Sequence, residues 1–425
     1  MCPTPTGSPP TARTSWAWSD LSTGERIKAL RGRELTQQAL AERTGLSLHT
    51  VQSAEQNRRL TLPTLMRLAD ALCVDTAVVL GQQPPRGSAR RSDLATVRAL
   101  SLAVHDTSAG LVPEADEAPT PAEVGATCRR AWDLYWQGRY TEAGGLTAPL
   151  LGDAAVCLHA QPDGQRAEAW GHLSDAYRVA AYSANLMGVR DLAYAAIGHA
   201  AFAASQAADD LRRALVESGR AWVYLRDARL PEALALAEKS ALTIEPRFSR
   251  ATVGELTAYG SHINFAAVVA SRMGDADRAG DYLSQSHATG ARMGREERAH
   301  GTLFGPTTAA TQAVGIHVAL GQTGKALGLI DTIGPTSALS NASQRRYELD
   351  KAMALADARL WDRSLETLEA ALTASPVWAR YQQLPRVILE KVGKGSTARL
   401  RRVAKLVGRP AWGADYPTAT RQASL

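Results

Sequence analysis

The sequence predicts an all-α protein in which a small N-terminal domain of five short helices precedes a long helical array. Three observations predict this class. The 425 residues exceed what one compact core usually holds. Beyond residue 126 the chain is rich in Ala, Leu, Glu and Arg and poor in the alternating β-branched residues of strands. Within that part, one short spacing of small residues recurs.

Composition divides the chain into five segments. Residues 1–19, rich in Pro, Thr and Ser, are expected to be a disordered tail, with Trp16 and Trp18 as candidates for docking on the next domain. The other boundaries follow from two proline-bearing breaks, QQPPRGSARR and LVPEADEAPTPAE. They give the small domain at 20–81, a linker with one expected helix at 82–125, the helical array at 126–409, and a tail at 410–425.

Residues 35–56, LTQQALAERTGLSLHTVQSAEQ, predict two short helices joined by a tight turn. Ala41 is small where the second helix would cross the first, and Gly45 suits the positive φ of the turn. Thr36 and Ser47 stand just before the helical runs, where their side chains can cap free backbone N–H groups. The supporting positions are Leu40, Leu46 and Val51 for the small core, Asn57 for the end of the second helix, and Pro63 for the first turn of the following helix.

With its flanking helices, from about Leu21 to Leu80, this segment resembles the helix-turn-helix of the Cro/phage-repressor class, often called the XRE family. In that family the second helix of the pair enters the major groove of DNA, and a Gln at the start of the first helix lies against a phosphate. The resemblance therefore implies double-stranded DNA as a partner. The DNA-binding residues that it implies are Gln37, Gln38, Ser47, Leu48, His49, Thr50, Gln52, Ser53, Arg58 and Arg59.

The outward positions of the expected recognition helix lack the Arg that many relatives carry there. Gln52 favours the reading of adenine, and Leu48 is available to a thymine methyl group. Residues 20–80 hold eight basic and seven acidic residues, so their electrostatic pull on DNA is small. We therefore expect weak binding per half-site and a two-fold homodimer on palindromic or paired sites. Phosphate neutralisation would fall to Arg31, Arg33, Arg43, Arg58 and Arg59.

The recurring spacing begins with a residue at the turn between two helices. The next helix starts two residues after that turn residue, and a small residue follows five residues after it. Its instances are Gly138, Tyr140, Ala143; Gly188, Arg190, Ala193; Ala228, Leu230, Ala233; Gly274, Ala276, Ala279; Gly321, Thr323, Ala326; and Arg359, Trp361, Ser364. These residues resemble tetratricopeptide (TPR) repeats over roughly residues 126–380. Such helix pairs stack into a superhelix with a concave surface. A helical bundle with chance spacing is the alternative.

A Cro-type head joined to a helical-repeat body resembles the RRNPP class of regulators, which bind short secreted peptides in the concave groove. The resemblance implies a peptide or small-molecule signal, as in quorum sensing. Amide side chains can both donate to and accept from such a ligand. The candidate ligand residues are Asn185 and Asn264, with Arg178, Tyr182 and His262 one turn away, and Thr308. The alternative for each is a role in helix packing or capping.

Two further stretches have two interpretations each. Residues 300–315 place Thr307, Thr308 and Thr311 on a helix of small residues, either for a close approach to a ligand or for tight helix packing. Residues 380–425 hold ten basic and two acidic residues, with an apolar stripe at Leu400, Val403, Leu406 and Val407. This segment would either cap the last repeat or touch DNA or an acidic partner.

Other functional classes lack sequence support. Common catalytic motifs are missing, the His residues are scattered, and Cys2, Cys73, Cys128 and Cys157 lack metal-ligand spacing, so we expect no enzyme, no cofactor and no metal. With neither a signal peptide nor a membrane span in the sequence, we expect a cytoplasmic protein and no membrane partner. The alternative function is a TPR scaffold that the head tethers to DNA and that recruits a protein partner.

Overall fold

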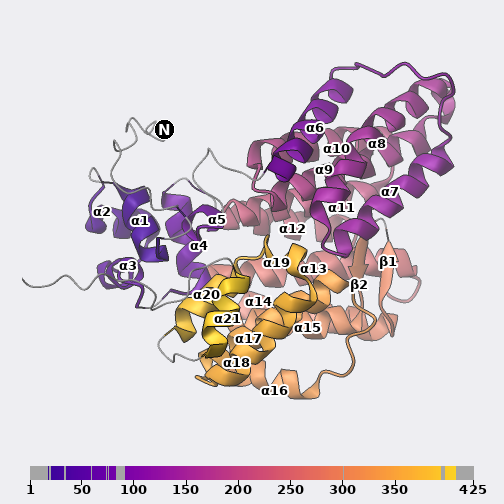
Figure 1. Cartoon of the computed structure of the whole chain (residues 1–425). Helices are drawn as coiled ribbons and strands as arrows, with labels where there is room; N and C mark the ends of the chain where they lie inside the picture. The colour runs from indigo at the N-terminus through magenta and orange to yellow at the C-terminus, as the bar shows by residue number, and fades with distance from the viewer. Residues whose placement is uncertain are drawn as a thin grey trace, which may run out of the picture.

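The computed structural model describes Trp18 and residues 21–32, 35–58, 60–72, 74, 76–82, 91–299, 301–393 and 398–407. Helices make up almost all of its regular structure, and a single two-stranded sheet interrupts them within the described residues. The all-α fold class is confirmed. Figure 1 shows a small helical domain at one side of a larger helical body.

The N-terminal domain contains five short helices, as the sequence predicts. They are α1 (Thr23–Arg31), α2 (Gln37–Thr44), α3 (Leu48–Glu55), α4 (Leu62–Ala71) and α5 (Thr76–Val79). Their shared core buries Ile27, Leu40 and Val51 completely. Trp18 docks on this domain as expected, because its indole Nε1 donates to the carbonyl of Val78 at 2.9 Å. Trp16 lies outside the described residues.

The segment expected as a linker contains a long helix, α6 (Arg91–Ser108). This helix packs against α8, α9 and α10 of the body, and Leu100 and Val104 are fully buried. The body thus begins its packing with α6, and α7 starts at Pro121, five residues before the expected boundary at 126.

Six helix pairs make the body. The first helices of the pairs are α7 (Pro121–Trp136), α9 (Ala167–Leu186), α11 (Asp210–Arg226), α13 (Val253–Met273), α15 (Pro306–Ala319) and α17 (Asn341–Asp357). Their partners are α8 (Tyr140–Ala160), α10 (Arg190–Gln206), α12 (Leu230–Thr243), α14 (Ala276–Met293), α16 (Thr323–Thr332) and α18 (Trp361–Ala374). A short 3-10 helix, Asp163–Gln165, precedes α9.

The recurring sequence spacing marks the turn of every pair. All six turn residues have positive φ, including the non-glycine residues Ala228 at 61° and Arg359 at 62°. Two residues later the second helix of each pair begins. The residue at the fifth position is fully buried in all six pairs, since a small side chain there allows the two helices to cross closely. The relation of these pairs to TPR repeats stays a prediction.

A β-hairpin between α14 and α15 was not expected. Strand β1 (Glu297–Ala299) pairs antiparallel with β2 (Thr302–Phe304), with Arg298 opposite Leu303. The buried ring of Phe304 lies so close to Gly260 in α13 that a Cβ there would come within 2.1 Å of it. The hairpin is therefore held by packing against α13 more than by its three-residue strands.

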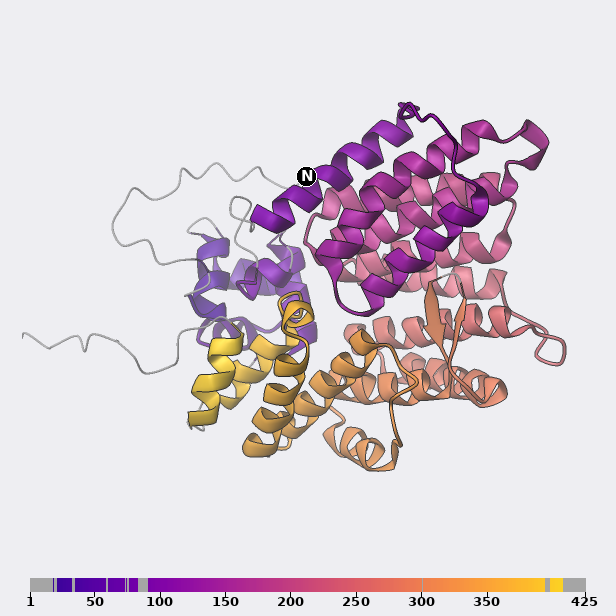
Figure 2. The same ribbon diagram turned by 45° about the vertical axis from the view of Figure 1, so that its right-hand side comes forward.

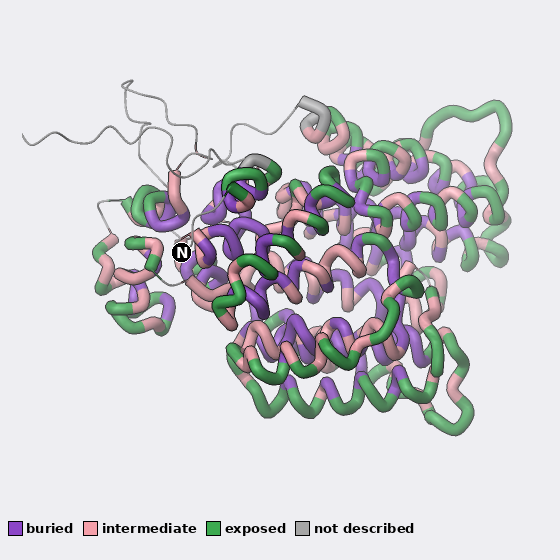
Figure 3. The backbone as a smooth tube through the Cα atoms, turned by 60° about the horizontal axis from the view of Figure 1, so that its bottom comes forward, coloured by how far each residue is buried: buried purple, intermediate pink, exposed green. Residues whose placement is uncertain are grey.

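The body curves until its last pair meets its first. Asn341 at the start of α17 donates to the carbonyl of Gln137 after α7 at 3.1 Å. From the other side, the indole of Trp136 donates to the carbonyl of Gly301 in the hairpin at 2.9 Å. Figure 2 shows the magenta helices of the first pairs facing the orange helices of the last ones. Buried residues line the interior of this array, and exposed residues follow its outer turns (Figure 3).

Three C-terminal helices, α19 (Pro376–Ala379), α20 (Leu384–Val392) and α21 (Ala398–Leu406), complete the body. α21 packs on α18 with Leu400 and Val403 buried, while Leu406 is 47% exposed. Two of its basic side chains, Arg399 and Arg402, pair with Glu369 of α18 at 3.3 and 2.9 Å. These contacts favour the capping interpretation of the basic segment.

The N-terminal domain docks on the body at two places, at the helices α12 and α13 and at α20. Met66 of α4 packs with Leu230 and Ala233 in one buried cluster. At α20, the guanidinium of Arg386 donates to the carbonyl of Leu80 at 2.7 Å, and Gln383 donates to the hydroxyl of Thr76. Figure 1 shows the result: α4 and α5 lie toward the body, and α2 and α3 lie at the outer edge.

Candidate DNA-binding surface and central cavity

The turn between α2 and α3 has the geometry that the sequence predicts. Gly45 adopts the left-handed conformation, with φ 63° and ψ 23°, and Ala41 is 3% exposed at the crossing. The Thr36 side chain accepts from Ala39 N at 3.0 Å, and the Ser47 side chain accepts from Thr50 N at 3.1 Å. Both predicted caps are confirmed, so the angle between the two helices is fixed at both of its ends.

Helix α1 fixes the position of α3. A Cβ on Gly24 would come within 2.2 Å of the carbonyl oxygen of Glu55, so only glycine permits this approach. Asn57, which has the expected positive φ of 55°, accepts from Gly24 N at 2.7 Å and donates to Ser22 Oγ at 2.8 Å. The end of α3 is thereby tied to the start of α1.

The first turn of α3 faces solvent. Ser47 and His49 are exposed and Leu48 is 37% exposed, whereas Thr50, Gln52 and Ser53 are half-buried. On the opposite side of the helix, Val51 and Ala54 are buried. The predicted reading residues therefore share the outward face of one helix.

Two of the predicted phosphate contacts have protein partners. Gln37 donates to Glu55 Oε2 at 2.6 Å, and Arg31 donates to Glu55 Oε1 at the same distance. Gln38 is exposed, and its amide donates to Glu42 at 3.1 Å. If Gln37 or Arg31 contacts DNA through the same N–H groups, its hydrogen bond to the Glu55 carboxylate must be replaced by one to a phosphate.

Among the other basic residues expected near DNA, Arg43 and Arg58 are exposed. Arg33 and Arg59 lie outside the described residues. Within the described part of the HTH domain, Arg43 and Arg58 are thus the members of the predicted phosphate-neutralising set whose side chains are exposed.

Residues 27–77 match the Cro/C1-type HTH DNA-binding domain. No curated protein and no solved structure matches the chain. The match covers the N-terminal domain from within α1 into α5, and supports DNA binding and transcription regulation. None of the described helices is long and apolar enough to cross a bilayer.

An open cavity of about 360 Å³ lies between the HTH domain and the first helices of the pairs. Residues of α7, α9, α11, α13, α15 and α17 line it, together with the hairpin residues 301–304. Its remaining wall comes from Leu62, Met66 and Thr76 of the HTH domain and from Gln383 before α20. One hollow thus touches the head and all six pairs of the body.

Three of the six predicted ligand residues line this cavity, namely Tyr182, Asn264 and Thr308. The Asn264 side chain accepts from the hydroxyl of Ser286 at 3.2 Å. Thr308 is committed to the protein, because its hydroxyl and its backbone N–H both donate to Glu296. Tyr182 stacks against Trp222 at 4.7 Å between ring centroids and forms part of an aromatic wall.

The other three predicted ligand residues are buried behind the wall. His262 is 0% exposed, and each ring nitrogen lies within 2.8 Å of a backbone carbonyl oxygen, of Ala258 or Ala214. Arg178 is 1% exposed and lies over the ring of Trp132 at 4.8 Å. Asn185 is 0% exposed, and no hydrogen bond to its side-chain amide is found among the described residues. For His262, these contacts favour a role in helix packing over a role in ligand binding.

The helix of residues 306–319 is stabilised from within. Glu296 accepts from Thr307 N at 2.7 Å and from Thr308 N at 2.9 Å, so a carboxylate of the chain occupies the N-terminus of α15. Thr311 donates to the carbonyl of Thr307 at 2.8 Å. Gly290 lies close enough to Pro306 that a Cβ would meet its backbone at 2.9 Å. These contacts favour the packing interpretation of this stretch.

The sequence reasoning missed the charged residues of the cavity, which are Arg226, Arg272, Arg346 and Asp350. A signal for two of them exists in the repeat spacing. Arg226 stands two residues before the turn residue Ala228, and Arg272 stands two residues before Gly274. Equivalent positions in successive helix pairs face the same side of the array, so two Arg at this position predict a shared charged site.

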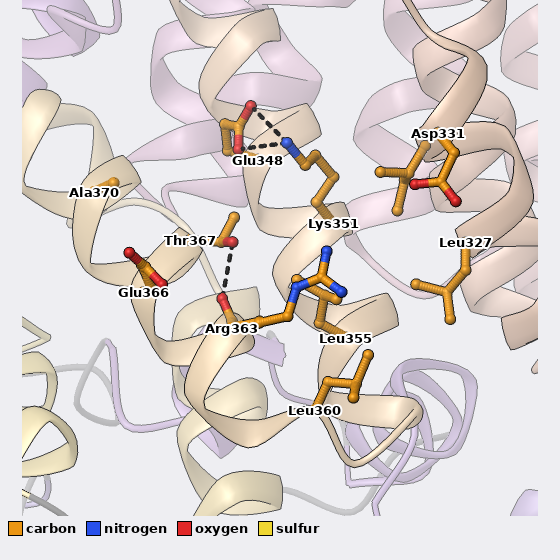
Figure 4. Close-up of a pocket in the computed structure, with 11 residues that line it drawn as sticks. Leu327, Asp331, Glu348, Lys351, Leu355, Leu360, Arg363, Glu366, Thr367 and Ala370 are labelled. Atoms are coloured by element: carbon orange, nitrogen blue, oxygen red, sulfur yellow. Dashed lines mark hydrogen bonds and ion pairs between the residues drawn. The ribbon is translucent and has the colours of Figure 1, made fainter.

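A second hollow, of about 430 Å³, lies on the outside of the body between α16, α17 and α18. Figure 4 shows its charged side chains around an apolar floor that includes Leu327, Leu355 and Leu360. Lys351 pairs with Glu348 at 3.3 Å within α17. The residues that line this second hollow come only from the last two helix pairs, and none of them belongs to the HTH domain. The central cavity is therefore the stronger candidate for a site that controls DNA binding.

Proposed function

We propose that the protein is a sequence-specific transcription regulator that binds DNA as a homodimer and responds to a signal bound in its central cavity. The observation that carries this proposal is that α4 and α5 belong to the HTH domain and also form a wall of the cavity. A ligand that fills the cavity would press on α4 and α5, which pack against α2 and α1, the two helices that hold α3.

The DNA contacts proposed here are the outward residues of α3, with Arg43 and Arg58 beside them. A helix-turn-helix reads few base pairs, so a second copy on a neighbouring half-site would supply the missing affinity and specificity. For the signal to act, it must bind one arrangement of head and body better than the other, because equal affinity shifts no equilibrium.

The DNA part is tested with the full chain by selecting bound sequences from random duplexes and titrating salt against the affinity for the selected site. We expect two half-sites about one helical turn apart and a log K that falls linearly with log salt. A salt-independent affinity would refute the phosphate contacts, and a single undivided site would refute the dimer.

The signal part is tested by repeating the binding measurement with an extract of small molecules from cultured cells. A change in affinity for the selected site supports the proposal. Unchanged affinity with every extract tested would leave the chain as a DNA-tethered scaffold and refute a signal-dependent regulator.

A further inference from the structure

The central cavity has an unbalanced charge. Arg226 projects from α11, Arg272 from α13 and Arg346 from α17, and the one acidic residue in the lining is Asp350 of α17. Asp350 is 3% exposed and accepts from Arg346 Nε at 3.2 and 3.1 Å through its two oxygens. The single carboxylate is therefore used by one of the three guanidinium groups.

No carboxylate pairs with either of the other two guanidinium groups in the described part of the chain, although the Arg226 guanidinium lies over the Trp222 ring at 5.9 Å from its centroid. Arg272 is 8% exposed, and neither a hydrogen bond nor an ion pair to its side chain is found within the described part of the chain. Arg226 Nε is fully buried and likewise has no hydrogen-bond acceptor among the described residues. A guanidinium offers five N–H donors, so the N–H groups of both side chains that face the cavity stay available to a ligand.

Arg346 is close enough to each of the other two arginines to affect its pKa. Burial and the repulsion from Arg346 lower the pKa of Arg272 to about 10, although Asp350 acts in the opposite direction. Burial is also the main cause that lowers the pKa of Arg226, and Arg346 adds to it. Both groups remain charged at neutral pH. Arg272 is buried and Arg226 is half-buried, and positive charge removed from water is costly unless it is neutralised, so an anion placed among the arginines would be bound favourably.

The rest of the lining limits the form of that anion. Tyr182, Trp222, Phe265 and Phe304 provide aromatic surface, and Tyr182 also contacts Trp132 edge to face. A volume of about 360 Å³ lies near the lower end of the range for small-molecule sites. The cavity thus suits a compact molecule with one apolar part and one charged end.

We propose that the central cavity binds a small organic oxyanion, a carboxylate or phosphate joined to an apolar or aromatic group. Arg226 and Arg272 donate to the oxyanion, in the planar paired geometry that guanidinium groups offer. Tyr182 and Trp222 contact the apolar group. This inference rests on the proposed role of the cavity as the signal site, and it names the chemical class of the signal.

Thermal unfolding of the full chain tests the inference without DNA. The probes are phenyl phosphate and 3-phenylpropionate, at constant ionic strength, and the neutral control is 3-phenylpropanamide. We expect at least one anion to raise the unfolding midpoint in a saturable way, since a ligand that binds only the folded state stabilises it. The amide should leave the midpoint unchanged. An equal rise with the amide, or no rise with either anion, would overturn the proposal.

The variant Arg272→Met removes one proposed ligand contact and keeps the apolar bulk. Because it also removes an uncompensated buried charge, we expect its midpoint without anion to equal or exceed that of the natural chain. Its response to the anion should fall at least tenfold in affinity. The matched control, Arg363→Met, changes an exposed arginine of the outer hollow and should keep the full response.

The outcomes separate this inference from the proposed function. An undiminished response in Arg272→Met would refute the assigned site, whatever the effect on DNA. If the anion binds with the expected dependence on Arg272 but leaves the affinity for the selected DNA unchanged, the anion site stands and the signal proposal fails.

Discussion

Gln52 lies on the outward face of α3, one turn beyond the exposed first turn of the helix. A Gln side chain can form two hydrogen bonds with adenine in the major groove, worth ~1–3 kcal/mol against a wrong base. We expect Gln52→Ala to weaken binding to the selected site by about tenfold or more and to relax the preference at one base pair. Gln56→Ala, an exposed change just beyond α3, serves as the control in the same gel-shift assay. Equal effects of the two changes would argue against base reading by Gln52.

Gly24 permits α1 and α3 to touch backbone to backbone. In Gly24→Ala the added methyl group would collide with the carbonyls of Glu55 and Ala54, and these cannot rotate away as a side chain can. We expect a destabilisation of about 1–3 kcal/mol, typical of overpacking. Hydrogen exchange of the HTH amides measures it.

Gly280→Ala is the control for this change, because nothing lies within 4 Å of the position and alanine favours a helix. Protection of the HTH amides as strong in Gly24→Ala as in Gly280→Ala would contradict the proposed contact.

Single residues also show where sequence reasoning reaches its limit. Ala41, Gly45 and Asn57 were predictable, because the local backbone conformation dictates their type. Gly24 was not, since its requirement comes from a carbonyl that is distant in sequence. The hydrogen bond from Gln37 to Glu55 was not predictable either, because Glu55 belongs to another helix.

At the level of single elements, Glu296 stabilises α15 from outside the helix. Glu296→Ala would leave Thr307 N and Thr308 N without their acceptor, at a cost of about 0.5–2 kcal/mol, as for other N-caps. We expect faster hydrogen exchange in the first turn of α15 and a lower unfolding midpoint. Glu297→Ala, on the adjacent residue, should leave that first turn as protected as in the natural chain. Unchanged exchange in Glu296→Ala would show that another group caps the helix.

The helix pairs were predictable and the hairpin was not, for a physical reason. A turn of positive φ followed by a buried small residue is a local signature that recurs in all six pairs. The strands of residues 297–304 are too short for an alternating pattern, and they depend on Gly260 and Trp136 from distant helices. A two-stranded ribbon is marginal by itself, so its sequence carries little signal of its own.

Stability of the whole molecule should depend on pH through three buried or half-buried histidines. Burial is the main cause that lowers the pKa of His172, His199 and His262 below the ordinary value of 6.5. Below pH 6.5 the unfolded chain gains protons that the folded chain resists, so stability falls as pH decreases towards the lowered pKa values.

We expect the unfolding midpoint to drop by a few degrees between pH 7 and pH 5.5, above the range where ordinary carboxylates titrate. His199→Gln should make this dependence shallower, because it removes one of the three groups whose pKa is lowered. A midpoint that rises over this interval would contradict the assignment.

The arrangement of the whole molecule was the least predictable from sequence. The spacing at Gly138 and its equivalents indicates pairs that stack, and an open superhelix is the usual result. Here Gln383 and Arg386 join the body to residues of the head about 300 positions away in the sequence, and Met66 packs with Leu230 and Ala233. Such contacts bring Arg226, Arg272 and the HTH domain to one cavity.

The contact between Asn341 and Gln137 has a consequence for how this protein could vary in length. An open stack of helix pairs tolerates the gain or loss of a unit, because each unit touches only its neighbours. In a closed array, one unit more or fewer would displace the two ends that meet, and with α17 also α20, on which the head docks. The number of pairs is therefore fixed by closure, and variation should concentrate in outer turns and in the terminal segments.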